Sequence, residues 1–297
     1  MNSPSPAGSS LRGASKGLRK LPNLARLKQL TAHSWNVFRY AGDFLHLFGI
    51  VVLLATLAKN RSVKGISRST QLLYFGVFVS RYLDLLDHSQ TLYLVFFKIT
   101  YILTSALTLV IFNQLSASYE RQKDTCSLAV IIVPCCMASV LLSDDHSVLE
   151  VFWTFSQFLE GFAMVPQYIF SYRDRVSRDM GVSLYVVSLG GYRVFYACNW
   201  IYKKWHMPGY SDIQSWSGGL IEIAFFCDYL LSRCTSLSIL RAAVLSVDTK
   251  INEFKEQAVQ VLGPSRAVSG EKVSDGGCEL RQRRAKQESD DGASRIV

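Results

Sequence analysis

Apolar residues occur along this chain in long blocks separated by short polar segments. Seven such blocks lie at residues 38–57, 70–86, 91–114, 127–142, 148–170, 182–202 and 213–231. Most of them approach the ~20 residues that a helix needs to cross the hydrocarbon core of a bilayer. The pattern therefore predicts an all-α membrane protein with seven transmembrane helices.

The two ends of the chain do not share this pattern. Residues 1–34 carry six lysines and arginines, no acidic residue and no long apolar run, so they are not a signal peptide. We expect a flexible basic arm, with a segment lying on the membrane surface as the alternative. From residue 236 the apolar density falls, and the sequence becomes rich in Gly, Ser and both charges, which is typical of disorder. The expected parts are thus a basic arm (1–34), a seven-helix transmembrane domain (35–235) and a disordered tail (236–297).

The charges of the loops predict an orientation in the membrane. The segments after the first, third and fifth blocks (59–69, 116–124 and 172–181) are rich in Lys and Arg. Those after the second and fourth blocks (87–90 and 143–147) are short and acidic. The positive-inside rule then places the odd-numbered loops and the C-terminus in the cytosol and the N-terminus in a lumen or outside the cell. The basic N-terminal arm argues for the opposite orientation.

Composition excludes several classes of protein. Nearly half of the residues (49%) are apolar, and the net charge of +9 comes mostly from the N-terminal arm. Basic residues are not interleaved with aromatic ones in a stripe, so nucleic acid is not an expected partner. The seven cysteines form no CxxC pair and no cluster with histidine at metal-ligand spacing, so we expect no cofactor or metal.

Two segments of the chain echo each other. Residues 65–81 and 181–193 both run from Gly-Ile/Val-Ser into an apolar stretch that contains an arginine. They coincide with the second and sixth blocks, as expected if blocks one to three and five to seven are parallel repeats joined by block four. Repeats of this kind build a ligand site between the two halves, near the middle of the membrane.

Charged and aromatic polar residues recur inside the apolar blocks, on single helical faces. They are Arg39, Asp43 and His46 in block one; Arg81 and Asp84 in block two; Glu150, Trp153, Gln157 and Glu160 in block five; Tyr192, Arg193, Tyr196, Asn199, Trp200 and Lys203 in block six; and Glu222 and Asp228 in block seven. Each one alone could be a neutralised structural pair, a residue reaching the interface or, for His46, a satisfied core histidine. Facing stripes of both signs instead indicate a water-accessible polar cavity, open to the lumenal side.

The charges of this cavity suggest the kind of ligand. Arg39, Arg81, Arg193 and Lys203 supply cations, and Asp84, Glu150 and Glu160 supply anions. A ligand with carboxylates at one end and an ammonium group at the other would match, because arginine binds carboxylates bidentately and Trp153 could stack on a cation. The sequence contains no recognisable nucleophile arrangement or phosphate loop, so we expect no enzyme activity.

Several motifs together resemble one family. They are "RYLDL" at 81–85, "IVP" at 132–134, "LEVFWTFSQFLE" at 149–160, "VPQ" at 165–167 and "GYRVFYACNWIY" at 191–202. They closely resemble the KDEL receptors, the ER lumen protein-retaining receptors, and the similarity runs from about Phe38 to Leu231. The resemblance implies a SWEET/PQ-loop-like fold of two three-helix repeats joined by a linker helix. It also implies a multi-pass protein of the ER and Golgi membranes that captures C-terminal Lys/His-Asp-Glu-Leu signals in the acidic Golgi and releases them in the near-neutral ER.

The resemblance further implies a role for each site residue. Arg81 would hold the terminal carboxylate, Arg39 and Lys203 the acidic side chains of the ligand, and Asp84 and Glu150 its basic residue beside Trp153. His46 would be the proton switch, Tyr192 and Glu160 a lock that tightens on binding, and Arg193, Tyr196, Asn199 and Trp200 the rest of the pocket.

The implied partners are KDEL/HDEL-type peptides, the retrograde (COPI) coat and membrane lipids. The chain departs from the family at Lys203, where arginine is usual, and in its long tail, which has no paired lysines soon after the seventh block. Two alternatives remain: a proton-coupled small-solute transporter of SWEET/PQ-loop-like architecture, and a structural membrane scaffold.

Overall fold

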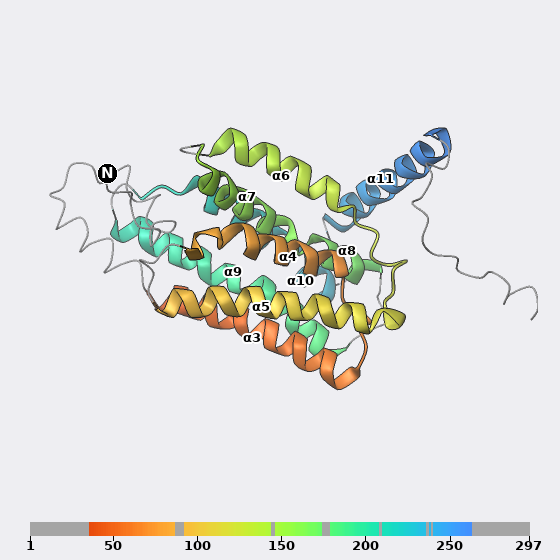
Figure 1. The fold of residues 1–297 in the computed structure, drawn as a ribbon, viewed down its shortest axis with the longest axis horizontal. Coiled ribbons are helices and arrows are strands. Elements are labelled where there is room, and N and C mark those ends of the chain that lie inside the picture. Colours follow the sequence, from red (N-terminus) through yellow and green to blue (C-terminus); the bar gives the residue numbers. More distant parts are fainter. Residues whose placement is uncertain are drawn as a thin grey trace, which may run out of the picture. The chain divides into compact units, whose positions relative to one another are not determined.

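The structure is a computed structural model, and it describes residues 36–86, 92–143, 146–173, 179–207, 210–235, 238 and 240–262. The predicted basic arm (1–34) and the last part of the predicted tail (263–297) lie outside these residues. Every regular element in the described part is helical, so the all-α prediction is confirmed for it (Figure 1). The α-helices are α3 (Val37–Asn60), α4 (Arg68–Arg81), α5 (Leu92–Gln114), α6 (Leu128–Leu142), α7 (Val148–Ala163), α8 (Val165–Arg173), α9 (Met180–His206), α10 (Ile213–Cys234) and α11 (Leu240–Leu262).

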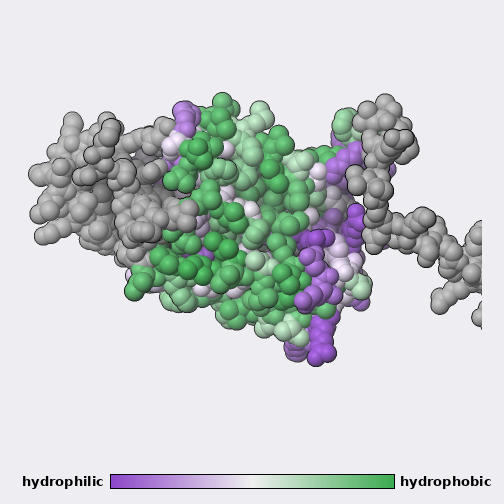
Figure 2. Space-filling model, in the orientation of Figure 1, coloured by the Kyte–Doolittle hydropathy of each residue, from purple (hydrophilic) through white to green (hydrophobic). Residues whose placement is uncertain are grey.

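Three of these helical segments are long and apolar enough to cross a membrane. They are α3, α5 and the continuous stretch Val148–Arg173 formed by α7 and α8; α6 is apolar but shorter. Large apolar side chains on them are exposed, for example Phe96, Leu103 and Val110, which share one face of α5 at intervals of seven residues. Figure 2 shows an extensive apolar surface on the face that α3 and α5 present. Such a surface is typical of a protein that faces lipid.

Two predicted helices differ from the observed ones. The block at 148–170 is interrupted at Met164, between α7 and α8, because Pro166 lacks an N–H and its ring crowds the carbonyl of the preceding turn. The block at 70–86 is α-helical only to Arg81, where Tyr82 leaves the helical conformation and a short 3₁₀ helix, Leu83–Leu86, follows. The spacing predicted that Arg81 and Asp84 share a face of one α-helix. This prediction is wrong, because the α-helix ends at Arg81 and Asp84 lies in the 3₁₀ helix.

Closely approaching helices position the residues inside the bundle. α3 packs along α9, and α7 packs against α4, α6 and α10. At the crossing of α7 and α10, a Cβ atom on Gly161 would lie 2.7 Å from the carbonyl oxygen of Gly218. The two backbones thus touch, which only residues without a side chain permit.

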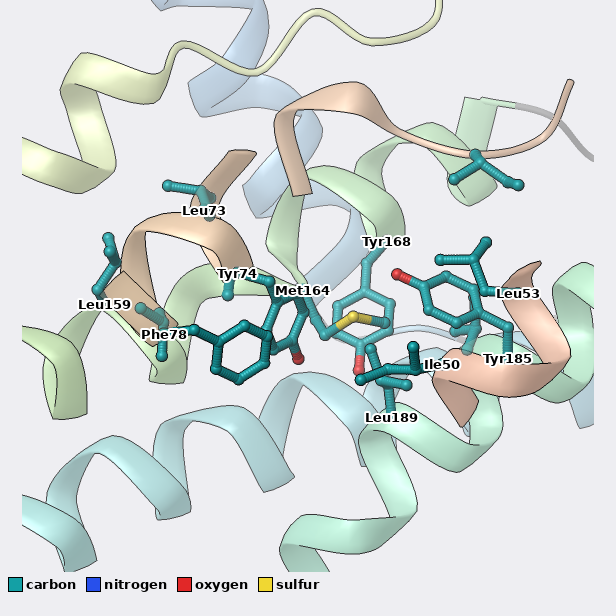
Figure 3. Packing of buried hydrophobic residues seen from close by; sticks show 14 of the residues in the cluster. Ile50, Leu53, Leu73, Tyr74, Phe78, Leu159, Met164, Tyr168, Tyr185 and Leu189 are labelled. Atoms are coloured by element: carbon teal, nitrogen blue, oxygen red, sulfur yellow. The ribbon is translucent and has the colours of Figure 1, made fainter. Parts of the chain in front are cut away.

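The interior between these helices is rich in aromatic residues. Figure 3 shows Tyr74, Phe78, Tyr168 and Tyr185 packed with Met164 and aliphatic side chains from α3, α4 and α9. Three of these rings carry hydroxyl groups, so the core has polar atoms at depths where a purely aliphatic core would have none.

Contrary to the predicted disorder, residues 240–262 form α11. Up to Asn252 this helix belongs to the same compact unit as the preceding helices, and the residues from Glu253 belong to a second unit. Asp248 is buried and accepts a hydrogen bond from Arg173 at 2.8 Å and another from Thr125. This anchor, together with Leu245, which packs against the main apolar core, holds α11 in place, and the mixed composition of the segment gave no sign of either contact.

Candidate ligand-binding site

A polar cavity of about 160 Å³ lies between α3, α4, α5, α7, α9 and α10. Ten of the thirteen predicted site residues line it. They are Arg39, His46, Arg81, Trp153, Glu160, Tyr192, Arg193, Tyr196, Asn199 and Trp200. The helical stripes read from the sequence thus converge on one cavity.

The other three predicted residues are placed differently. Glu150 is buried on the first turn of α7 and Lys203 is buried near the end of α9, but neither belongs to the cavity wall. The ammonium group of Lys203 lies 5.8 Å from the ring centre of Tyr210, which does line the cavity. The side chain of Asp84 lies outside the described residues.

Glu160 is the centre of a buried charge network. Its Oε2 atom lies 2.6 Å from Nη2 of Arg81 and 2.5 Å from Nη2 of Arg193, and its Oε1 accepts a hydrogen bond from the Tyr192 hydroxyl at 2.8 Å. Arg193 also reaches Glu222 on α10, with 2.5 Å between Nε and Oε2. Two guanidinium groups and two carboxylates therefore neutralise one another, as buried charges must.

Arg81 and Arg193 differ in their accessibility. The Arg81 side chain is 16% exposed, whereas that of Arg193 is 4% exposed. Arg81 is also oriented by α7, because its Nε donates to the Ser156 hydroxyl and its Nη2 to the Ser156 carbonyl, each at 3.1 Å. An anion that enters the cavity therefore meets Arg81 before Arg193.

His46 lies in an aromatic sandwich on the cavity wall. Its ring stacks on Tyr192 and Tyr101, with ring centres 4.3 and 4.8 Å away, and only 5% of the residue is exposed. Its Nε2 atom has no hydrogen-bond partner in the part of the chain that the structure describes. A proton acceptor that arrived with a ligand could therefore engage this nitrogen.

Several residues of the cavity wall were not among those selected from the sequence. Asp43, noted there only as part of the first stripe, accepts hydrogen bonds from the hydroxyls of Tyr196 and Tyr93, the latter at 3.0 Å. Lys98 and Tyr101 on α5 form part of the cavity wall. A single lysine inside the otherwise apolar third block was the available signal for this wall.

A second set of missed residues lies at the start of α10. Tyr210, Asp212 and Ser215 line the cavity, and Asp212 caps α10 by accepting a hydrogen bond from the Ser215 N–H at 3.0 Å. The sequence pattern gave no reason to select them, because they lie at the boundary of the seventh block.

Among the described residues, no group of three or more His, Cys, Asp and Glu side chains is arranged to hold a metal ion. The chemistry that the cavity offers is recognition of opposite charges through Arg81 and its neighbours.

Comparison with known proteins gives a consistent family. The model of the family described as "ER lumen protein retaining receptor" matches residues 62–203. The ER lumen protein-retaining receptor of Drosophila melanogaster is 33% identical over 195 residues, which cover 65% of this chain and 91% of the relative. The protein of that name from Entamoeba histolytica is 36% identical over 196 residues, covering 66% and 91%. ER lumen protein-retaining receptor 2 of Gallus gallus is 36% identical over 195 residues, covering 65% and 91%.

The chain belongs to the ER lumen protein-retaining receptor family. The resemblance seen in the sequence is confirmed, and the transporter alternative is not favoured. The family is one of receptors and not of known enzymes, and its name together with the membrane-capable helices indicates the ER and Golgi membranes. The matched segment contains the Arg81–Glu160–Arg193 network, whereas Arg39 and His46 precede it and Glu222 follows it.

Proposed function

We propose that this protein is a retrieval receptor that binds the C-terminal Lys/His-Asp-Glu-Leu signal of escaped ER lumenal proteins in the Golgi and returns them to the ER. The observation that carries the proposal is the partly exposed Arg81 guanidinium, held between Ser156 and Glu160 on the wall of a polar cavity. A terminal carboxylate is a bidentate partner for such a fork. The names of the relatives support retention of ER lumenal proteins as the purpose of this recognition.

The same proposal includes seven membrane spans: α3, α4, α5, α6, α7 with α8, α9 and α10. The cavity is lined from the starts of α3, α5, α7 and α10 and from the ends of α4 and α9, which is the alternation that successive spans require. We propose that α3–α5 and α7–α10 are two three-helix repeats joined by α6. With the N-terminus in the lumen and the C-terminus in the cytosol, the cavity end of the bundle faces the lumen, where the ligand is.

Within the cavity, we propose that Arg81 binds the ligand's terminal carboxylate, and that Arg39 and Lys203 face its acidic side chains. Asp84 and Glu150 would bind the basic residue at the start of the signal, next to Trp153. The hydrogen bond between Tyr192 and Glu160 serves as the lock, and His46 as a proton switch. Arg193, Tyr196, Asn199 and Trp200 complete the pocket.

Further partners follow from the family resemblance. We propose that the receptor contacts membrane lipids through its apolar surface and the retrograde (COPI) coat on its cytosolic side. No paired lysines follow α10 closely, so a coat contact would use a different signal in this chain.

The proposal predicts binding of a labelled peptide that ends in Lys-Asp-Glu-Leu, tighter at about pH 5.5 than at about pH 7.5. Arg81→Lys keeps the charge but loses the planar fork, so the affinity should fall more than tenfold, which corresponds to roughly 1.4 kcal/mol or more. Fluorescence titration of the purified receptor measures both effects. The matched control is the same peptide with an amidated C-terminus, which should bind weakly to both proteins. Equal affinity of the acid and amide peptides would contradict the role of Arg81.

A further inference from the structure

Glu222 is a fully buried carboxylate that does not line the cavity. Its side chain is 0% exposed, and its Oε2 atom pairs with Nε of Arg193 at 2.5 Å. Its other oxygen, Oε1, has no hydrogen-bond partner among the residues described. An ionised oxygen left without a donor in this environment is costly, so the second oxygen of Glu222 calls for an explanation.

The negative charges of the two carboxylates, Glu160 and Glu222, are stabilised to different extents by their neighbours. Glu160 pairs with two guanidinium groups, those of Arg81 and Arg193, and accepts a hydrogen bond from the Tyr192 hydroxyl. Glu222 pairs with one guanidinium group, that of Arg193, which it shares with Glu160. Of the two acids, Glu222 is therefore the one whose negative charge is less stabilised.

Among the described residues, Arg193 is the one cation that forms an ion pair with Glu222. Arg81 on α4 acts on Glu222 but is itself paired with Glu160, and the nearby hydroxyls belong to Tyr74 on α4, Tyr168 on α8 and Tyr192 on α9. Those of Tyr74 and Tyr168, which Figure 3 shows beside Met164, have no hydrogen-bond partner in the described part of the chain. His46 on α3 faces the same network from the cavity side, near Glu160, Arg193 and Arg81.

Binding of an anion to Arg81 upsets the balance of this network. Without a ligand carboxylate, two guanidinium groups face two carboxylates, and the sum of their charges is zero. A carboxylate bound to Arg81 brings the sum to −1 in a buried site, where like charges raise one another's proton affinity. The sum of charges returns to zero if one proton from solvent binds to Glu222, the acid whose negative charge is less stabilised.

We propose that Glu222 takes up this proton when an anionic ligand terminus binds Arg81, so that Glu222 couples ligand capture to acidity through Arg193. The proton binds to the unengaged Oε1, and Oε2 continues to accept from Arg193. No covalent bond of the ligand changes. Glu222 is thus a positioning and coupling residue, and the inference rests on the proposed binding of a C-terminal peptide.

Glu222→Gln provides a test in which the substitution should raise the peptide affinity at neutral pH and not lower it. The glutamine keeps the shape and an oxygen for Arg193, but it removes the charge permanently, as protonation would. Affinity for the Lys-Asp-Glu-Leu peptide should therefore rise near pH 7.5 towards its value near pH 5.5, and the pH profile should flatten. One coupled proton accounts for at most about tenfold in affinity per pH unit, so a gain of up to this size per unit is expected. A merely structural role would instead lower the affinity at every pH.

Asp228→Asn is the matched control on the same helix. Asp228 is also buried, but it accepts hydrogen bonds from the hydroxyls of Tyr172 at 2.8 Å and Ser238 at 2.6 Å, and it is not part of the cavity wall. This variant should keep the wild-type pH profile. A wild-type slope in Glu222→Gln, or the same flattening in Asp228→Asn, would overturn the proposal.

An infrared difference spectrum separates failure of this inference from failure of the proposed function. Adding the peptide to the wild-type receptor should produce a protonated-carboxyl band that Glu222→Gln lacks and Asp228→Asn retains. If the wild type binds the peptide and the band persists in Glu222→Gln, another group takes up the proton and the inference is wrong. If the wild type binds no such peptide at either pH, the proposed function fails, and the coupling fails with it.

Discussion

Arg81, His46 and Glu160 come from three different helices and meet at one wall of the cavity. Each has a distinct physical character: Arg81 is partly exposed, His46 is enclosed by two tyrosine rings, and Glu160 is neutralised by two arginines. The proposed recognition of a ligand carboxylate would therefore depend on how these few side chains share charge.

His46 should contribute to the pH dependence of capture. Its ring lies near Glu160, Arg193 and Arg81, so a ligand carboxylate bound to Arg81 would add a negative charge close to it. Proton and ligand then stabilise each other, and affinity falls as pH rises. His46→Ala should bind weakly at about pH 5.5 and show a flatter profile up to about pH 7.5, with peptide titration as the measurement. A steep wild-type profile in the mutant would exclude His46, and additive flattening with Glu222→Gln would show that the two groups act separately.

Sequence reasoning could find the residues that form stripes. Arg39, Asp43 and His46 recur at steps of four and three, and the sixth block repeats polar residues along one broad face. The α5 wall was missed because Lys98 is a single charge in an apolar block. Glu222 was noticed without a role, since its partner Arg193 could be known only from how α9 and α10 pack.

At the scale of the element, local chemistry determined where helices begin and end. Pro166 explains the break between α7 and α8, but a proline alone does not predict a break, because Pro134 lies inside the uninterrupted helix α6. The fate of residues 240–262 could not be predicted either, because α11 depends on the long-range contacts of Asp248 with Arg173 and Thr125. The amino-acid composition of a segment does not reveal contacts with residues that are distant in the sequence.

Asp179 caps α9, the helix that carries much of the predicted site. Its Oδ1 accepts from the Val182 N–H at 3.0 Å and its Oδ2 from the Asn60 side chain at 2.9 Å. Asp179→Ala should lower the free energy of unfolding by about 1 kcal/mol, whereas Asp179→Asn, which also caps well, should lose little. Thermal denaturation of the detergent-solubilised receptor measures the difference, and equal stability of all three proteins would exclude the cap as a stabilising contact.

The hydrogen bonds of Asp179 also predict the pH range in which its contribution to stability does not change. The hydrogen bond from Val182 holds the pKa of the Asp179 carboxyl below its ordinary value of 3.8. Its stabilisation is therefore complete above that value and is lost only as pH falls through the lower, folded-state pKa. The pH profile of peptide binding between about pH 5.5 and 7.5 should be the same in Asp179→Asn and the wild type.

At the scale of the whole molecule, the proposed topology can be tested independently of any ligand. The cavity is lined from alternating helix ends, and the same end of the bundle carries the 143–147 loop that leads into α7. The opposite end carries the basic segment 116–124. The positive-inside rule and the position of the cavity therefore agree, and only the basic arm at 1–34 argues against them.

Single cysteines introduced into a background without the seven native ones should report the two sides. Arg121 and His146 are both exposed, one in each of the two segments. In sealed ER microsomes, a membrane-impermeant maleimide should label Arg121→Cys at once, because the proposed topology places that segment in the cytosol. His146→Cys should react only after the membrane is permeabilised, because the proposed topology places it at the lumenal end with the cavity. The reverse pattern would place the cavity on the cytosolic side, where no lumenal protein could reach Arg81. Immediate labelling of both cysteines would mean that the two segments lie on the same side of the membrane, so that α6 would not be a span.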